Sequence, residues 1–382
     1  MEKKHIHKSF GKWVAIVLYI IAGGFLGFRV ASRAIDAGKS GQGIALMILS
    51  IIWILVEFYL AMIIQVIVHE GGHLIAGLMS GYKFASFRIL NLMLVKKNGK
   101  FRFKKFSLTG TGGQCLMAPP DMVDGHIPYV LYNLGGAMAN VIFSAIIYGI
   151  YVATGGVSDF CIIIIIIGLI LAILNGIPMQ MGEVNNDGYN AMSLGKNKAA
   201  ERDFWIQMKI NELTTLGVRL KDMPSEYFEI PVKDNMDNSI CVTIGVFACC
   251  RAMDELDLEK ARYIAEKLLK EGSGLIGIHK NMLISEVIFC ELLGANDKDL
   301  IDRLYEGKFL KYTMAMASNP SILRMRYAYK LFYKDNEKEA AEVLKDFEKA
   351  AAKYPHESEI LGERELIALT KEKYSELENG RV

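Results

Sequence analysis

The sequence predicts a mainly α-helical, polytopic membrane protein with about four transmembrane helices and a soluble helical domain. Apolar runs of membrane-spanning length are confined to the first half of the 382 residues, and 52% of the chain is hydrophobic. An Asn-Gly pair separates two short β-like segments within that half. From about Lys198 onward, the composition shifts to charged segments with the period of amphipathic helices.

Four apolar segments are long enough to cross a bilayer, since a spanning helix needs about 20 apolar residues. They are residues 13–30, a stretch within Ile44–Met79, residues 127–152 and residues 160–178. A signal peptide is the alternative for the first segment, but Arg29 and Arg33 end its apolar run without a clear cleavage site. As one helix, Ile44–Met79 would measure about 54 Å, so it must break, tilt or project into the cytoplasm.

The loop between the second and third segments is basic and predicts the orientation. Its cations are Lys83, Arg88, Lys96, Lys97, Lys100, Arg102, Lys104 and Lys105. The loop after the third segment carries only Asp159 as a charge. Because cytoplasmic loops are rich in Lys and Arg, we expect a multi-pass protein of the cell membrane with both termini in the cytoplasm.

Within the basic loop, Asn98-Gly99 lies between residues 88–95 and residues 100–104. Asn and Gly tolerate the positive φ that tight hairpin turns require, so a membrane-associated β-hairpin is predicted here. Two roles remain open for this hairpin. Its edge can bind an extended substrate by strand addition, or the hairpin can simply cap the membrane surface.

The pentapeptide His-Glu-Gly-Gly-His occupies residues 69–73, inside the apolar stretch. On a helix, His69 and His73 project from one face and can share a Zn²⁺ ion, while Glu70 is placed to act on a metal-bound water. Ionisable side chains are costly in hydrocarbon and usually face a cavity, a partner or a ligand. The pattern therefore predicts a hydrolytic zinc site in a membrane or at its edge.

A catalytic zinc site needs a third protein ligand and one position open for water. The fourth segment descends toward the cytoplasmic side and is followed by Asp187, which we choose as the third ligand. Glu183, in the same connection, is its competitor. Further candidates in the preceding loop are Asp121, Asp124 and His126.

Three motifs together resemble the site-2 protease family of intramembrane zinc metalloproteases. They are His69-Glu70-x-x-His73, Gly136-x-x-x-Asn140, and Asn175-x-x-Pro178 leading to Asp187-Gly188, all within about residues 45–195. The resemblance implies that His69, His73 and Asp187 bind zinc. It also implies that Glu70 is the general base and that the basic loop forms a membrane-associated hairpin.

The same resemblance assigns supporting roles to two asparagines. Asn175 would help to hold the substrate strand or the oxyanion, and Asn140 would support the site. The step from Asn175 to Asp187 covers twelve positions. This step is longer than family members commonly have, and the extra residues add about one helical turn or a loop.

The predicted function is hydrolysis of a peptide bond in or near the transmembrane segment of a membrane-anchored regulatory protein or peptide. The alternatives are a membrane-anchored zincin that cuts outside the bilayer and a non-catalytic metal-binding membrane scaffold or transporter. A net charge of +2 without a dense basic stripe indicates no nucleic-acid partner.

Three regions are expected: residues 1–43 as an N-terminal tail and first transmembrane helix, 44–195 as the zinc-protease core, and 196–382 as a cytoplasmic helical domain. In the last region, amphipathic helices are predicted at 258–271, 323–333, 337–353 and 358–377, and an extended stretch at 226–244. The helix pairing suggests tetratricopeptide-like hairpins without a clean repeat signature. We expect this domain to bind a cytoplasmic protein partner or restrain access to the site, with a stabilising appendage as the alternative.

Overall fold

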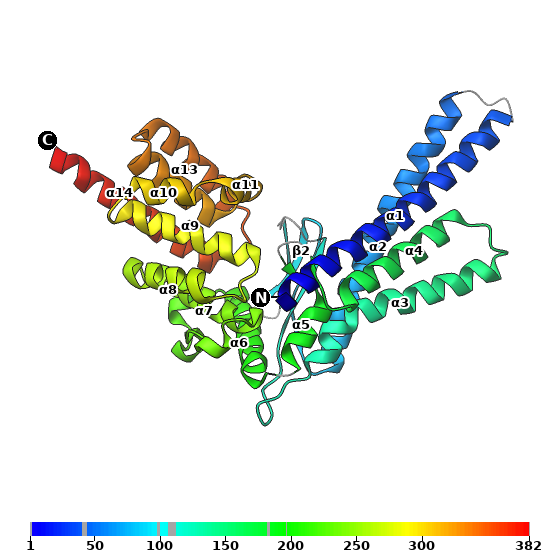
Figure 1. Cartoon of the computed structure of the whole chain (residues 1–382), viewed down its shortest axis with the longest axis horizontal. Coiled ribbons are helices and arrows are strands. Elements are labelled where there is room, and N and C mark those ends of the chain that lie inside the picture. The colour runs from blue at the N-terminus through cyan, green and yellow to red at the C-terminus, as the bar shows by residue number, and fades with distance from the viewer. Residues whose placement is uncertain are drawn as a thin grey trace. The chain divides into compact units, whose positions relative to one another are not determined.

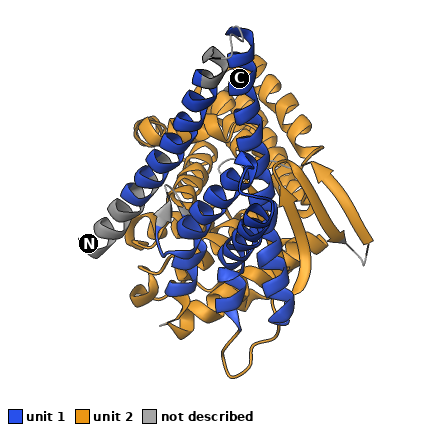
Figure 2. Cartoon of the chain, turned by 90° about the vertical axis from the view of Figure 1, so that its right-hand side faces the viewer, with its two compact units in different colours: residues 1–82, 128–192 blue, residues 83–127, 193–382 orange. Residues whose placement is uncertain are grey.

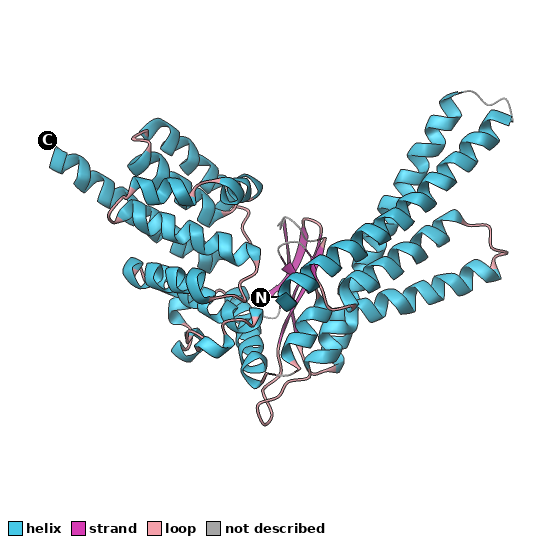
Figure 3. Cartoon of the chain, in the orientation of Figure 1, coloured by secondary structure: helices cyan, strands magenta, loops and turns pink. Residues whose placement is uncertain are grey.

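The computed structural model of the chain describes residues 2–39, 44–97, 100–105, 112–181, 184–195 and 197–381. It is mainly helical and contains a small antiparallel sheet (Figures 1 and 3), which confirms the predicted fold class at that level. The chain forms two compact units (Figure 2). Unit 1 consists of Met1–Tyr82 and Pro128–Met192, and unit 2 of Lys83–Ile127 and Ser193–Val382.

Unit 1 is built around four long helices. They are α1 (Glu2–Lys39), α2 (Ile44–Met79), α3 (Tyr129–Ala153) and α4 (Asp159–Gly176). Within the described part of the chain, these four helices are long and apolar enough to cross a membrane, as predicted. α2 is a single unbroken helix of 36 residues, so of the three alternatives for this segment a break is excluded, and tilt or projection remains.

Glycines allow α2 and α3 to pack closely. A Cβ atom on Gly135 of α3 would lie 2.7 Å from the backbone oxygen of Gly72 on α2, which is too close for any side chain. Gly71 differs, because a Cβ atom there would meet nothing within 4 Å. The glycine at position 72 therefore serves helix packing, in line with the role of small residues between apolar helices.

A charged cluster joins α1 to α2 and α4. Arg33 contacts Asp159 at 2.7 Å, and Arg29 pairs with the same carboxylate. Arg33 also lies 3.9 Å from Glu57, whose Oε1 accepts a hydrogen bond from Trp53 Nε1 at 2.7 Å. Glu57 therefore contributes to the packing of α1 against α2.

The sheet in unit 2 contains the predicted hairpin and two further strands. Its strands are β1 (Lys83–Ile89), β2 (Leu92–Lys97), β3 (Lys100–Lys105) and β4 (Gly113–Ala118), in the spatial order β3-β2-β1-β4. β2 and β3 pair antiparallel with Lys97 opposite Lys100, which confirms the hairpin, although its first strand begins at Leu92 and residues 88–89 belong to β1. The turn residues Asn98 and Gly99 lie outside the described residues.

The sheet belongs to the same compact unit as the C-terminal helices. Trp205 on α6 (Lys198–Leu216) donates a hydrogen bond from Nε1 to the Pro120 oxygen at 2.9 Å, just after β4. Lys104 on β3 donates to the Pro355 oxygen at 2.7 Å. Residues 83–127, which the sequence grouped with the protease core, are thus held by side-chain contacts to the C-terminal half.

The C-terminal half is helical throughout most of its length. After α6 come α7 (Ser239–Asp254), α8 (Leu258–Glu271), α9 (Gly277–Leu293), α10 (Lys298–Leu304), α11 (Gly307–Ala315), α12 (Pro320–Ala328), a π-helix (Tyr329–Tyr333), α13 (Glu337–Ala351) and α14 (Glu357–Arg381). The four predicted amphipathic segments all coincide with helices, although α13 ends at Ala351, two residues before the predicted end. The extended conformation expected up to residue 244 is wrong from Ser239, because α7 is buried on nearly all sides and so lacks an amphipathic period.

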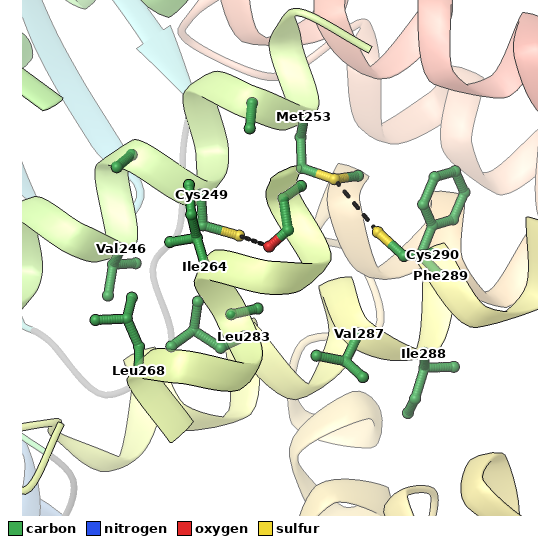
Figure 4. Close-up of a cluster of buried hydrophobic side chains, with 14 of the residues drawn as sticks. Val246, Cys249, Met253, Ile264, Leu268, Leu283, Val287, Ile288, Phe289 and Cys290 are labelled. Atoms are coloured by element: carbon green, nitrogen blue, oxygen red, sulfur yellow. Dashed lines mark hydrogen bonds between the residues drawn. The ribbon is translucent and has the colours of Figure 1, made fainter. Parts of the chain in front are cut away.

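α7, α8 and α9 build the main core of unit 2 (Figure 4). Val246 of α7, Leu268 of α8 and Leu283 of α9 are among its buried side chains. The two cysteines in this view are unpaired: Cys249 donates a weak hydrogen bond to the Ala261 oxygen, and Cys290 contacts a methionine sulfur. These thiols serve packing, since free cysteine behaves as a small apolar residue.

A buried ion cluster ties α9, α12 and α14 together. Arg324, which is 1% exposed, binds Glu286 at 2.7 Å and Glu363 at 2.6 Å. Burial raises the pKa of Glu363 to about 7, against the opposing effect of the Arg324 charge. The guanidinium is thus the main group that offsets the cost of burying two carboxyl groups.

Replacing this arginine should destabilise unit 2 strongly. We expect Arg324→Met to lower the free energy of unfolding by about 3 to 5 kcal/mol, because it leaves two acids buried without a cation. Arg364→Met is the matched control: its pair with Glu348 is about half exposed, and its loss should cost less than about 1 kcal/mol. Amide hydrogen exchange in α9 and α14 measures both effects, and equal protection in the two variants would contradict the assignment.

Candidate metal centre

The two histidines of the pentapeptide lie side by side on α2. His69 and His73 are both buried, and their ring centroids are 4.8 Å apart. Their Nε2 atoms face each other at 3.2 Å. The helical spacing of four residues thus brings two imidazole nitrogens to one point, as the sequence predicted.

Asp187, the first residue of α5 (Asp187–Leu194), completes a triangle of ligand atoms. Its Oδ2 atom lies 3.2 Å from His69 Nε2 and 3.3 Å from His73 Nε2. Donors at 2.0–2.1 Å from a tetrahedral metal ion are about 3.3 Å apart, so the triangle has the size that one such ion requires. Among the described residues, this is the group of side chains that can hold a metal ion.

The charge of Asp187 suits this role. Burial raises the pKa of the carboxyl group, but the contacts with His69 and His73 outweigh burial and lower that pKa to about 2. The side chain is therefore ionised at neutral pH. An anionic oxygen and two imidazole nitrogens form a donor set that suits zinc and other first-row metals.

Each imidazole is oriented through its second nitrogen. His73 Nδ1 donates a hydrogen bond to the Tyr132 backbone oxygen at 2.8 Å, and His69 Nδ1 donates to Asn140 Oδ1 at 2.7 Å. Both partners lie on α3. A proton on Nδ1 leaves the Nε2 lone pair directed toward the triangle, which is the usual arrangement of metal-binding histidines.

Gly136 explains the spacing of the second motif. A Cβ atom at this position would lie 2.6 Å from both His69 Cε1 and His73 Nε2. The glycine therefore leaves the space that the imidazoles occupy. Asn140, one helical turn further along α3, then reaches His69, so the Gly-x-x-x-Asn spacing serves both histidines.

Asn186 holds Asp187 in place. Its side chain donates to the oxygens of Leu174 and Ile177 and accepts from the backbone N–H groups of Met179 and Tyr189. This buried amide fastens the end of α4 to the start of α5. Asn186 belongs to none of the motifs in the sequence, although asparagine just before a helix is a common N-cap signal.

The long connection between α4 and α5 folds into a short hairpin. β5 (Gln180–Met181) pairs antiparallel with β6 (Val184–Asn185). Of the two alternatives for the extra residues, the described part of the connection contains no added helical turn and instead forms this short strand pair beside Asn186. Gly188 then allows close approach to α4, since a Cβ atom there would lie 2.8 Å from the Gly176 carbonyl carbon.

The other candidate ligands have different surroundings. His126 Nδ1 bonds Glu201 Oε2 at 2.7 Å within unit 2, and Asp121 and Asp124 are exposed. Glu183 lies outside the described residues. Of the proposed acids that the structure describes, Asp187 is the one that lies against the histidine pair.

The structure gives the positions of the two predicted catalytic residues, but it does not test their roles. Glu70 is 8% exposed and lies on α2 between the two histidines. Asn175, in the last turn of α4, donates to the Leu171 oxygen of its own helix at 2.9 Å. This hydrogen bond lies within α4 and does not reach His69, His73 or Asp187. The role of Asn175 in the site therefore remains a prediction.

Comparison with protein-family models, with curated proteins and with solved structures finds no match for this chain. The geometry establishes a group of two imidazoles and a carboxylate that can bind a metal ion. The identity of the metal and the reaction follow as a proposal from this geometry and from the motifs.

Proposed function

We propose that the protein is an intramembrane zinc metalloprotease of the site-2 protease type. It would cut a membrane-anchored regulatory protein or peptide in or near its transmembrane segment. The observation that carries this proposal is the triangle of His69, His73 and Asp187, in which both histidines lie on a helix long and apolar enough to cross a membrane. Three protein ligands leave the fourth tetrahedral position open, as in catalytic zinc sites.

The chemistry divides between the ion and the chain. Bound zinc would polarise the scissile carbonyl and acidify a water molecule. Glu70 would take the proton from this water and deliver it to the leaving amine. His69 and His73 would donate their Nδ1–H groups to Asn140 Oδ1 and the Tyr132 backbone oxygen, and so keep their metal-binding nitrogens directed at the site. Asn175 would help to hold the substrate strand or the oxyanion, as the family resemblance implies.

A transmembrane substrate must unwind locally before cleavage, because helical carbonyl groups are hydrogen-bonded and inaccessible.

Strand β3 is an edge of the described sheet, so its outer backbone groups can pair with an extended segment. Phe101 and Phe103 on this strand are 60% and 71% exposed. Exposed aromatic rings beside lysines also suit a membrane surface, which supports the second role of the hairpin.

The proposed topology follows from the distribution of charge. The basic residues of Lys83–Ile127 would lie in the cytoplasm, with both termini on the same side of the cell membrane. The helices after Lys198 would then form a cytoplasmic, tetratricopeptide-like domain. Paired helices of this kind commonly present a surface for a protein partner, and we propose such a partner here.

The proteolytic proposal is tested by comparing membranes that contain the wild-type protein with membranes that contain Glu70→Gln. We expect new protein N-termini that map within transmembrane segments in the wild type and their loss, by at least about 100-fold, in the variant. Gly71→Ala is the control, because its Cβ atom has open space. Terminal sequencing by mass spectrometry reports both.

The alternatives give different results in the same experiment. New termini located outside transmembrane segments would favour a membrane-anchored zincin. Equal processing by wild type and Glu70→Gln, with zinc retained in both, would contradict the general base. Retained physiological activity without any cleavage would favour a metal-binding scaffold or transporter.

A further inference from the structure

Gln65 is a buried polar residue in an apolar helix, and no sequence motif includes it. It lies one helical turn before His69 on α2 and is 0% exposed. A buried primary amide costs free energy unless its donors and its acceptor are hydrogen-bonded. The partners of this side chain therefore indicate what it does.

The Gln65 amide links α4 to the residue that orients His69. Its Nε2 donates to the Ile164 backbone oxygen on α4 at 2.9 Å and approaches Ser144 Oγ at 3.5 Å. Its Oε1 accepts from Asn140 Nδ2 at 2.8 Å. Asn140 Nδ2 also donates to the Gln65 backbone oxygen at 2.9 Å, so both of its hydrogens are directed to Gln65.

These contacts determine the orientation of each group in turn. The Ile164 carbonyl can only accept, so the NH₂ group of Gln65 must face it and Oε1 must face Asn140. The NH₂ group of Asn140 then faces Gln65, and its Oδ1 faces His69. Because Oδ1 can only accept, His69 carries its proton on Nδ1 and keeps the Nε2 lone pair for the metal.

The opposing helix leaves space for this amide. A Cβ atom on Gly168 of α4 would lie 2.8 Å from Gln65 Cδ. α4 thus has a glycine where the head of Gln65 packs and, one turn earlier, the carbonyl group of Ile164 that receives its hydrogen bond. Space and hydrogen bonding both hold Gln65 in one orientation.

We propose that Gln65 is a positioning residue that sets the tautomer and orientation of His69 through Asn140. The proposal rests on the metal site of the proposed function, but not on proteolysis. It predicts that Gln65 affects metal affinity although it contacts no ligand atom of the triangle. Its effect must pass through Asn140, and this distinguishes positioning from general packing.

The test is the zinc affinity of the detergent-purified, full-length protein, measured by competition with a chelator. We expect Gln65→Met, which matches the side-chain length without hydrogen bonding, to weaken zinc binding by about 10- to 100-fold. In Gln65→Glu, the protonated carboxyl group keeps an acceptor oxygen for Asn140 and an O–H donor for the Ile164 oxygen, so zinc affinity should stay within about threefold of wild type. Ser144→Ala removes only the long contact and should leave the affinity unchanged.

A double-mutant cycle completes the test. Asn140→Ala should weaken zinc binding, and adding Gln65→Met should change the affinity by less than about threefold further. A full additional loss in the double variant would overturn the proposal, because Gln65 would then act through packing. Wild-type affinity in Gln65→Met, or an equal loss in Gln65→Glu and Gln65→Met, would also overturn it.

The melting temperature of each metal-free variant separates misfolding from loss of positioning. A Gln65→Met protein that melts as wild type does but binds zinc weakly supports the proposal. The absence of zinc binding in the wild type would instead contradict the proposed function. The two failures are therefore distinguishable in one set of measurements.

Discussion

Zinc content should fall from about one ion per chain to near background in His73→Ala and in Asp187→Ala, and should remain at about one in Glu70→Gln. The reason is the geometry of the triangle, in which each ligand lies 3.2–3.3 Å from the other two. Removal of one corner leaves two ligands, which is too few for a stable catalytic zinc site. Elemental analysis of detergent-purified protein measures this directly.

Glu70→Gln is the internal control for this measurement. The glutamate lies between the histidines in sequence but is not part of the ligand triangle. Zinc lost from Glu70→Gln would place the glutamate among the ligands and contradict its role as a base. Zinc retained in Asp187→Ala would exclude Asp187 as a ligand and make Glu183 the next candidate.

Gly136→Ala should weaken zinc binding by at least about 100-fold, although the residue offers no ligand atom. The added methyl group would lie 2.6 Å from both imidazoles, so α3 must shift or the rings must rotate. A rotated imidazole loses its hydrogen bond to Asn140 or to the Tyr132 oxygen and no longer directs Nε2 to the site. Zinc affinity by chelator competition measures the effect.

Gly71→Ala is the matched control for Gly136→Ala. Both substitutions add one methyl group to a helical glycine and both raise helix propensity. A Cβ atom at Gly71 meets nothing within 4 Å, so zinc binding should be unchanged. Equal affinity in the two variants would show that α2 and α3 are farther apart around the histidines than the structure has them.

Much of the architecture follows from local sequence pattern. Four apolar runs predicted the helices of membrane-spanning length, because apolar length is a property of a continuous segment. Asn98-Gly99 predicted the β2-β3 pairing, because turn chemistry is also local. The spacing of four residues brought His69 and His73 to one face of α2, because the helical period sets that geometry.

Other parts of the fold depended on burial that the sequence pattern does not show. The start of α7 was predicted to be extended. The apolar residues of this helix have no preferred face, because it is buried on nearly all sides by packing in the core that it forms with α8 and α9. β1 and β4 were not predicted as part of the sheet. β1 and β4 pair with each other although β2 and β3 lie between them in the sequence, so local turn chemistry does not specify this pairing.

The sequence by itself determined the histidine pair, because both ligands lie on one helical turn. It left five candidates for the third ligand, and only the tertiary structure placed Asp187, which is 118 positions from His69, against both imidazoles. The roles of Gly136, Asn186 and Gln65 were likewise decided by contacts between α2, α3, α4 and α5. A helical period specifies what lies on one helix, whereas a metal centre depends on distances between helices, and those distances are set by packing.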